Sequence, residues 1–268
     1  MPLIFFLLFS LSLNASERII ALAPSISEIV FALGKGDELV GVSEYASYPS
    51  EVQEITKIGG YSNPSLEKIF SLNPSLVIGQ SQYNKTLAQL NKLGIKTLSL
   101  EMKTINEIKH SITQIATSLN TDPSPLLEPI DRAIKQAQGK PTTDKKILIV
   151  YGLSLDINRG LYIAGHEIFY EDIIHLCGAK NAYESNAQSQ PVLHYEGLLA
   201  LNPDRVILLH HNATDGEVDF TKAKELWYNI PINAGVNKDI IILSKDYLSI
   251  PSHRIAQSII TLCEAVSK

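Results

Sequence analysis

The chain has 268 residues, a net charge of −5 and a composition that is 45% hydrophobic and 19% charged. This length suits one large domain or two medium ones, and the balance is that of a globular protein. The acidic net charge and the lack of a basic stripe argue against a nucleic-acid partner.

The first residues form an uncharged apolar stretch. Residues 2–13 read PLIFFLLFSLSL, and the first charged residue is Glu17. This stretch has the length of a signal-peptide core and is shorter than the ~20 residues of a membrane-spanning helix. We therefore expect a signal peptide over residues 1–15, cleaved after Ala15; a buried strand or a membrane anchor is the alternative. No cysteine lies near the cleavage point, so we expect no lipid anchor and a soluble protein in a Gram-negative periplasm.

Beyond the leader, strand and helix patterns alternate, which indicates an α/β lobe with a mostly parallel sheet. The helix after the first strand opens with Ser25-x-x-Glu28, the pattern of a capping box, and ends at Gly34. Asn63 is expected to cap the helix of the segment that follows it, with Pro64 in the first turn. The expected strands are 18–22, 39–42, 76–79 and 95–100, and the expected helices are 49–55, 66–72, 85–93 and 105–119.

A single long helix, about residues 124–138, is expected to join this lobe to a second one, despite Pro129 near its start. At 1.5 Å per residue it spans about 22 Å, and a helix is stiffer than a loop. We therefore expect an N-terminal lobe at 16–122, a connecting helix at 123–140 and a C-terminal lobe at 141–268, which close on one another by only a few degrees.

The second lobe repeats the alternation of the first. Its expected strands are 146–152, 205–209 and 240–243, and its expected helices are 168–176, 195–201, 221–226 and 252–266. The predicted fold is therefore α/β, with two Rossmann-like lobes and a ligand cleft between them.

One phrase occurs twice, 129 residues apart. Leu66–Ile78 reads LEKIFSLNPSLVI and Tyr195–Ile207 reads YEGLLALNPDRVI, with six of 13 positions identical. Each copy predicts a short helix, a stop at Asn-Pro and a buried strand, and each places a glutamate in the first turn: Glu67 and Glu196. The helix dipole stabilises such a carboxylate, but one acid on each lobe also suits a two-fold symmetric partner.

The chain has two cysteines, Cys177 and Cys263. In an exported protein an isolated pair favours a disulfide, here between two helix-like segments; two buried thiols are the alternative. Neither cysteine has a second cysteine or a histidine at ligand spacing, so a metal site is not indicated.

The chain shows no nucleophile elbow, P-loop or dinucleotide-binding glycine motif, so we expect neither an enzyme nor a catalytic cofactor. Four histidines in or near loops are candidate contacts to a chelated metal, with solvated loop residues as the alternative: His166, His194, His210 and His211.

Several segments together resemble the helix-backbone periplasmic binding proteins of ABC importers, which carry cobalamin, ferric siderophores or haem. They are RIIALAPSISEIVFALG, SEYASYPSEVQEITKIGGYSNPSLEKIFSLNPSLVIG, EDIIHLCGAKNAYES, HYEGLLALNPDRVI and LSKDYLSIPSHRIAQSIITLCEAV. The resemblance covers about residues 17–267. It implies a monomer that binds a small molecule, docks on an inner-membrane permease dimer through Glu67 and Glu196, and has a Cys177–Cys263 disulfide.

The resemblance also implies a set of cleft residues. Aromatic positions that contact a corrin ring correspond to Tyr45, Tyr61, Tyr162 and Tyr247, and a polar cleft position corresponds to Asp246. Two tryptophan positions become Gln80 and Gln190, and a cleft arginine becomes Ile250. The resemblance therefore implies a corrinoid ligand, and tyrosine rings in loops after strands also suit a flat macrocycle. A ferric siderophore, haem, or a nickel or cobalt chelate is the alternative ligand, and a tetrapyrrole chelatase is the alternative of another class.

Overall fold

A computed structural model describes residues 17–60, 63–139, 142–153, 159–185, 189–211 and 219–267. The predicted signal peptide and Tyr61 lie outside the described residues. Within them, no helix combines the length and the apolar character that a bilayer crossing requires.

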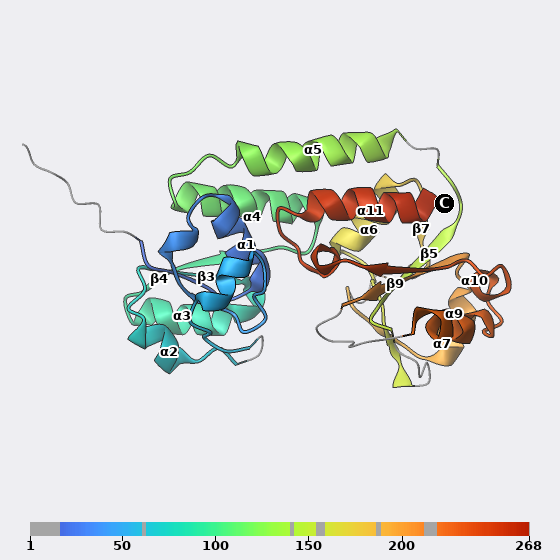
Figure 1. The fold of residues 1–268 in the computed structure, drawn as a ribbon, viewed down its shortest axis with the longest axis horizontal. Coiled ribbons are helices and arrows are strands. Elements are labelled where there is room, and N and C mark those ends of the chain that lie inside the picture. Colours follow the sequence, from blue (N-terminus) through green and yellow to red (C-terminus); the bar gives the residue numbers. More distant parts are fainter. Residues whose placement is uncertain are drawn as a thin grey trace, which may run out of the picture.

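Two four-stranded parallel sheets form the centres of two lobes, which stand side by side in Figure 1. The first sheet has the order β2-β1-β3-β4 and the second the order β10-β9-β5-β7. The strands are β1 (Ile19–Ala21), β2 (Leu39–Val42), β3 (Leu76–Gln80), β4 (Lys96–Leu100), β5 (Lys146–Tyr151), β7 (Lys180–Asn181), β9 (Arg205–His210) and β10 (Ile240–Ser244). A short antiparallel pair is added to the second lobe by β6 (Leu161–Tyr162) and β8 (Val192–Leu193).

The sheets have the same topology. Read in chain order, each lobe places its first strand between its second and third strands, and its fourth strand beside the third. The two repeated segments occupy equivalent places, since α2 (Leu66–Ser71) leads into β3 and α7 (Tyr195–Leu201) leads into β9. The repeated asparagine ends each helix in the left-handed conformation, with φ of +44° at Asn73 and +43° at Asn202. The following proline prevents the helix from continuing.

The remaining helices cover the sheets. They are α1 (Pro24–Ala32), α3 (Asn84–Lys92), α4 (Ile105–Ser118), α5 (Ser124–Gln138), α6 (Phe169–Leu176), α9 (Phe220–Tyr228), α10 (Asn233–Val236) and α11 (Ile255–Ser267). Short 3₁₀ turns are η1 (Gly36–Glu38), η2 (Ser50–Glu54), η3 (Ser81–Tyr83) and η5 (Asp246–Ser249).

The single helix α5 runs along one side of both lobes (Figure 1). It packs against α4 of the first lobe and against α6 and α11 of the second. One apolar core continues through this junction and includes Ile112, Ile130 and Ile259. Because the lobes share buried surface here, large relative motions would expose apolar area to water.

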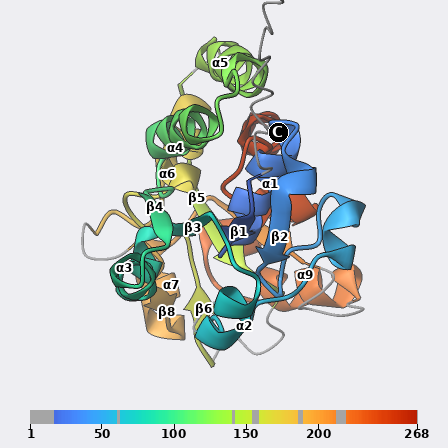
Figure 2. The ribbon, with the colours of Figure 1, turned by 90° about the vertical axis from the view of Figure 1, so that its left-hand side faces the viewer.

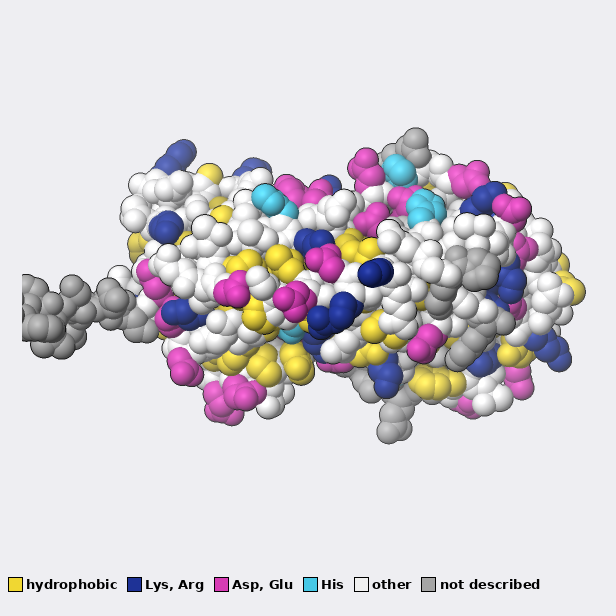
Figure 3. All heavy atoms as spheres, turned by 90° about the horizontal axis from the view of Figure 1, so that it is seen from above, with side chains coloured by type: hydrophobic (Ala, Val, Ile, Leu, Met, Phe, Trp, Pro, Cys, Tyr) yellow, Lys and Arg dark blue, Asp and Glu magenta, His cyan; other side chains and the backbone are white. Residues whose placement is uncertain are grey.

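Seen from the α5 side, the molecule consists of two rounded halves with a narrower middle (Figure 3). Acidic and basic side chains are interspersed over this face. Such mixing does not create the single-sign field that binds a polyanion.

Two expected helix caps are wrong. The N-cap of α1 is Ala23, without a side-chain hydrogen bond, and Glu28 instead pairs with Arg254 of the other lobe. Charge-assisted hydrogen bonds to a buried guanidinium are stronger than a hydrogen bond to a backbone N–H, which explains why Glu28 bonds Arg254 and does not cap α1. The cap of α2 is Ser65, whose Oγ accepts from the Lys68 N–H at 3.3 Å, and Pro64 lies before the helix.

The predicted disulfide between Cys177 and Cys263 is present and joins the end of α6 to α11. Both cysteines are buried in the shared core. The bond closes a loop with a sequence separation of 86 residues.

We expect the Cys177→Ala/Cys263→Ala variant to fold and to be about 2–4 kcal/mol less stable, because a long unfolded loop is no longer constrained. Urea denaturation of the oxidised wild type and the variant measures the difference. Thiol titration of the denatured, unreduced wild type should find no thiols; two thiols would contradict the disulfide.

Candidate functional site

The candidate site lies where loops at the carboxyl ends of strands from both lobes meet. The loop after β2 carries Tyr48, whose ring lies against Arg254, a residue that follows β10 in the other lobe. After β4, the carbonyl of Lys103 accepts from the Phe169 N–H of α6 at 2.6 Å. Ligands of open α/β sheets bind at this end of the strands.

Two of the predicted tyrosines present their rings to solvent. Tyr45 follows β2 and is 61% exposed, and Tyr162 of β6 is 62% exposed. The Tyr45 ring stands near Gly60, where an added Cβ would lie 3.5 Å from Cε2 of Tyr45. Tyr162 is paired across β6 and β8 with Val192, which is also exposed. Each lobe thus offers an exposed aromatic ring.

The two predicted glutamines differ in their surroundings. Gln80 is buried at the end of β3, where its Nε2 donates to Ser25 Oγ at 3.1 Å and lies 3.6 Å from Met102 Sδ. Gln190 is exposed, and its Nε2 donates to the Tyr151 hydroxyl at 3.4 Å. Burial raises the pKa of Tyr151 well above its ordinary value, so this phenol stays neutral.

Asp246 and Tyr247 form the 3₁₀ turn after β10. Oδ2 of Asp246 accepts from Arg254 Nη1 at 2.7 Å, while the side chain remains 55% exposed. Burial alone would raise the pKa of Asp246, but the hydrogen bond and the positive charge of Arg254, with backbone hydrogen bonds, together outweigh it and lower that pKa. The Tyr247 hydroxyl lies 3.0 Å from Thr261 Oγ1, which fixes the ring against α11. Ile250 is half-buried.

The four histidines occupy different environments. His210 is buried, with Nδ1 2.9 Å from Ser244 Oγ and its ring edge-to-face with Phe220. His166 Nδ1 lies 2.9 Å from Glu171, and that hydrogen bond raises the pKa of His166. His194 is exposed at the start of α7, and His211 is half-buried. Among the described residues, no three His, Cys, Asp or Glu side chains gather as a metal site.

The repeated glutamates are both exposed in the first turns of their helices, Glu67 in α2 and Glu196 in α7. Both helices lie on the side of the molecule away from α5, one on each lobe (Figures 1 and 2). Leu66 and Phe70 of α2 are exposed beside Glu67. The two carboxylates are therefore accessible to a partner that spans both lobes.

Sequence reasoning missed three residues at the junction: Glu28, Tyr48 and Arg254. Glu28 and Arg254 are 3% and 5% exposed and bind one another, and Tyr48 is 42% exposed. Burial alone would lower the pKa of Arg254, but the hydrogen bonds to Glu28 and Asp246 and the negative charges of both carboxylates together outweigh it and raise that pKa. A charged pair 226 residues apart leaves no local pattern in the sequence. The Ser25-x-x-Glu28 motif drew attention to Glu28, but it predicted a helix cap and not an ion pair.

The profile of the periplasmic binding protein family matches residues 19–247. The chain belongs to this family. Over 266 residues it is 27% identical to the vitamin B12-binding protein of Vibrio parahaemolyticus, covering 97% of this chain and 93% of the relative.

Solved structures of similar periplasmic binding proteins share the fold. The haem-binding protein RhuT of Roseiflexus sp. RS-1 has a TM-score of 0.77 at 26% identity, covering 94% of this chain and 98% of that one. The vitamin B12-binding protein BtuF of Vibrio cholerae has a TM-score of 0.74 at 24% identity, covering 94% and 96%. The two-lobe α/β prediction is thereby confirmed.

Proposed function

We propose that this protein is a periplasmic substrate-binding protein of an ABC importer that captures a corrinoid and delivers it to an inner-membrane permease. The observation that carries the proposal is that each of two lobes of equal topology, joined by α5, carries an exposed tyrosine: Tyr45 on the first and Tyr162 on the second. A flat ring held between aromatic faces gains apolar burial, while the phenol hydroxyls bind its polar edge. The curated relatives named vitamin B12-binding proteins support this ligand class.

In this proposal Tyr61, Gln190, Asp246 and Tyr247 add to the binding surface, and Gln80 supports it from within the first lobe. Residues 1–15 direct export, and 16–122 and 141–268 form the lobes on either side of the connection at 123–140. The protein acts as a monomer and performs no catalysis. Its work is capture, plus a ligand-biased shift between slightly different lobe arrangements.

Haem is the second candidate ligand. Haem iron accepts tyrosine as an axial ligand, and the exposed phenols of Tyr45 and Tyr162 are sterically accessible for that role. His166 and His194 offer imidazoles nearer to solvent than the buried His210. The similarity to haem-binding RhuT favours this alternative.

Retention of a coloured ligand tests the proposal directly. Purified mature protein is mixed with cyanocobalamin, haemin or a ferric catecholate, desalted and scanned by absorbance. We expect a stoichiometric corrinoid spectrum, which the Tyr45→Ala/Tyr162→Ala variant should largely lose, whereas an exposed-site control, Lys92→Ala, should keep it. Retention of haemin alone would establish the second candidate. Retention of none of the three, with metal insertion into a porphyrin, would identify a chelatase-like enzyme instead.

A further inference from the structure

Arg254 lies at the centre of a polar cluster that crosses between the lobes. Its Nε donates to Glu28 Oε2 at 2.9 Å and its Nη2 donates to Glu28 Oε1, while Nη1 donates to Asp246 Oδ2 at 2.7 Å. Ser252 Oγ donates to Glu28 Oε2 at 2.5 Å. Glu28 belongs to α1 of the first lobe, and the other three residues belong to the second.

Two tyrosine rings also lie near the guanidinium group of Arg254. The Arg254 Cζ atom lies 4.0 Å from the centre of the Tyr48 ring, from the first lobe, and 5.9 Å from that of Tyr247. A delocalised planar cation suits such a face, and its rigid fork suits two carboxylates. Edge and face contacts together leave Arg254 a single orientation.

Burial makes the Glu28–Arg254 pair sensitive to the loss of either partner. Glu28 and Arg254 are almost fully buried, so removing either partner leaves an uncompensated charge in a medium of low dielectric constant. The neighbouring His253 does not add a competing charge, because burial and the positive Arg254 lower its pKa to about 4. The pair thus forms a buried charged contact between the lobes, in addition to the connection by α5.

The cluster reaches the candidate site through two residues that are only partly covered. Tyr48 is 42% exposed and Asp246 is 55% exposed, and Arg254 holds both, one from each lobe. Tyr48 lies three residues beyond the exposed Tyr45, in the same loop. A preset pair of contacts lowers the ordering cost of binding.

We propose that Arg254 is a positioning residue, which joins the lobes through Glu28 and holds Tyr48 and Asp246 as a preset pair of ligand contacts. The role of Tyr48 and Asp246 as ligand contacts rests on the proposed function. The joining of the lobes by Arg254 and Glu28 does not. Tyr48 thereby becomes an additional ligand-contacting residue.

A distance measurement without ligand tests the joining of the lobes. Spin labels are placed at Lys92→Cys of α3 and Lys222→Cys of α9, both exposed, and the interlobe distance distribution is recorded by electron–electron double resonance. We expect Arg254→Met and Glu28→Gln to shift and broaden the distribution, with Arg254→Lys intermediate. The surface ion pair Lys109–Asp131 provides the matched control, and Lys109→Ala should leave the distribution unchanged. An unchanged distribution in Arg254→Met would overturn the proposal.

Affinity for the chromophore retained by the wild type tests the positioning of the ligand contacts. If loosened lobes adopt the competent arrangement about a tenth of the time, affinity falls about tenfold. We expect that loss for Arg254→Met and Glu28→Gln, and no further loss when the two changes are combined.

Tyr48→Leu keeps the test decisive if the buried variants fail to fold, because the Tyr48 side chain is partly exposed. It should weaken binding about tenfold while the melting temperature and the interlobe distance stay unchanged. Wild-type affinity in Tyr48→Leu would refute its role as a contact. A wild type that retains no chromophore would refute the proposed function, and the distance measurement would still decide whether Arg254 joins the lobes.

Discussion

Replacing Glu67 and Glu196 together by alanine is expected to abolish ligand uptake while leaving ligand affinity unchanged. Both carboxylates are exposed, one on each lobe and away from α5, where a permease of two like subunits would meet them (Figures 1 and 2). Charges at the rim of an interface set its orientation and its association rate. Each single variant should lose part of the uptake, because one acid still engages one subunit.

Uptake is measured in proteoliposomes that contain the permease, and affinity is measured by equilibrium dialysis of the same preparations. Glu54→Ala/Glu225→Ala is the control, since it removes one exposed acid from each lobe outside the repeated helices. It should transport at the wild-type rate. A parallel fall in affinity for the Glu67/Glu196 variant would instead assign these residues to the ligand site.

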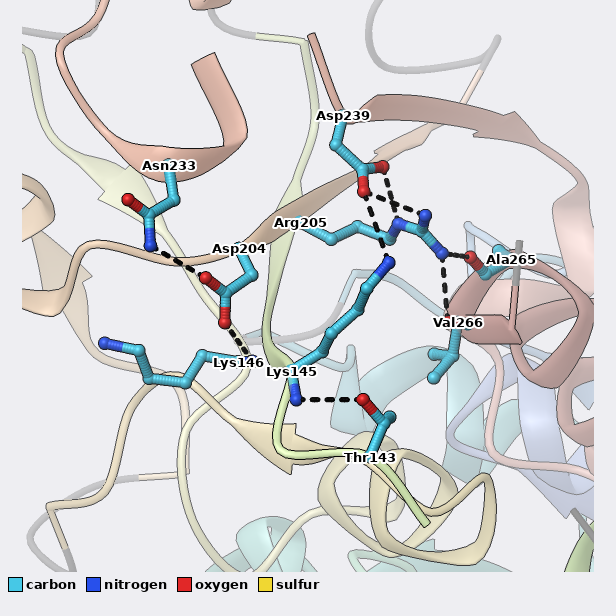
Figure 4. Close-up of polar contacts among 9 residues, drawn as sticks. All are labelled: Thr143, Lys145, Lys146, Asp204, Arg205, Asn233, Asp239, Ala265 and Val266. Carbon is cyan, nitrogen blue, oxygen red and sulfur yellow. Dashed lines mark hydrogen bonds and ion pairs between the residues drawn. The ribbon is translucent and has the colours of Figure 1, made fainter. Parts of the chain in front are cut away.

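Arg205→Met is expected to produce the largest loss of stability among single substitutions in the second sheet. Arg205 is buried; its Nε and Nη2 donate to Asp239 at 2.6 and 2.8 Å, and its Nη1 donates to the carbonyls of Ala265 and Val266 at 2.6 and 2.9 Å (Figure 4). The side chain thereby connects β9, the segment before β10 and the last turn of α11. Methionine would fill much of the space but would remove the donor to two helix-end carbonyls and leave the Asp239 carboxylate with Lys145 alone.

We expect a loss of up to about 3–5 kcal/mol, the range for buried pairs that lose one partner, because Arg205 is buried and Asp239 is partly buried. Lys145 offers only a weak substitute, with its Nζ 3.7 Å from Asp239. Urea denaturation of both proteins measures the difference. Arg132→Met removes an exposed ion pair of 3.5 Å with Glu128 and should change stability by less than about 0.5 kcal/mol. Equal stability of Arg205→Met and the wild type would show that the contacts in Figure 4 contribute nothing net.

Local pattern was a good guide wherever the determinant was local. The repeated helix, Asn-Pro and strand segments are present at α2–β3 and α7–β9, because an asparagine in the left-handed conformation and a proline act on neighbouring backbone. The helix predicted over 124–138 is present as α5, with Pro129 inside it. Pattern misled at Ser25 and Glu28, where a local capping signal competed with a stronger distant partner.

The ligand-binding residues stay predictions. The resemblance named Tyr45 and Tyr162, and both are exposed, while Tyr48 was not named although it lies in the same loop as Tyr45 and contacts Arg254. The histidines next to one another in sequence were treated alike, yet His210 ends a buried strand and bonds to Ser244, whereas His211 is half-buried. The direction of a side chain at a strand end depends on which strand lies next to it, and the sequence does not show which strands are neighbours.

By itself, the sequence determined the alternation of elements, the duplication of the lobes, the connecting helix and the cysteine pair, because periodicity, turn residues and composition act over short stretches of chain. Only the tertiary structure decided which charges pair across the junction. Glu28 and Arg254 are far apart in the chain, and they meet in a buried environment only when two complete lobes bring them together. Their pairing therefore depends on the packing of the whole molecule, which no single segment encodes.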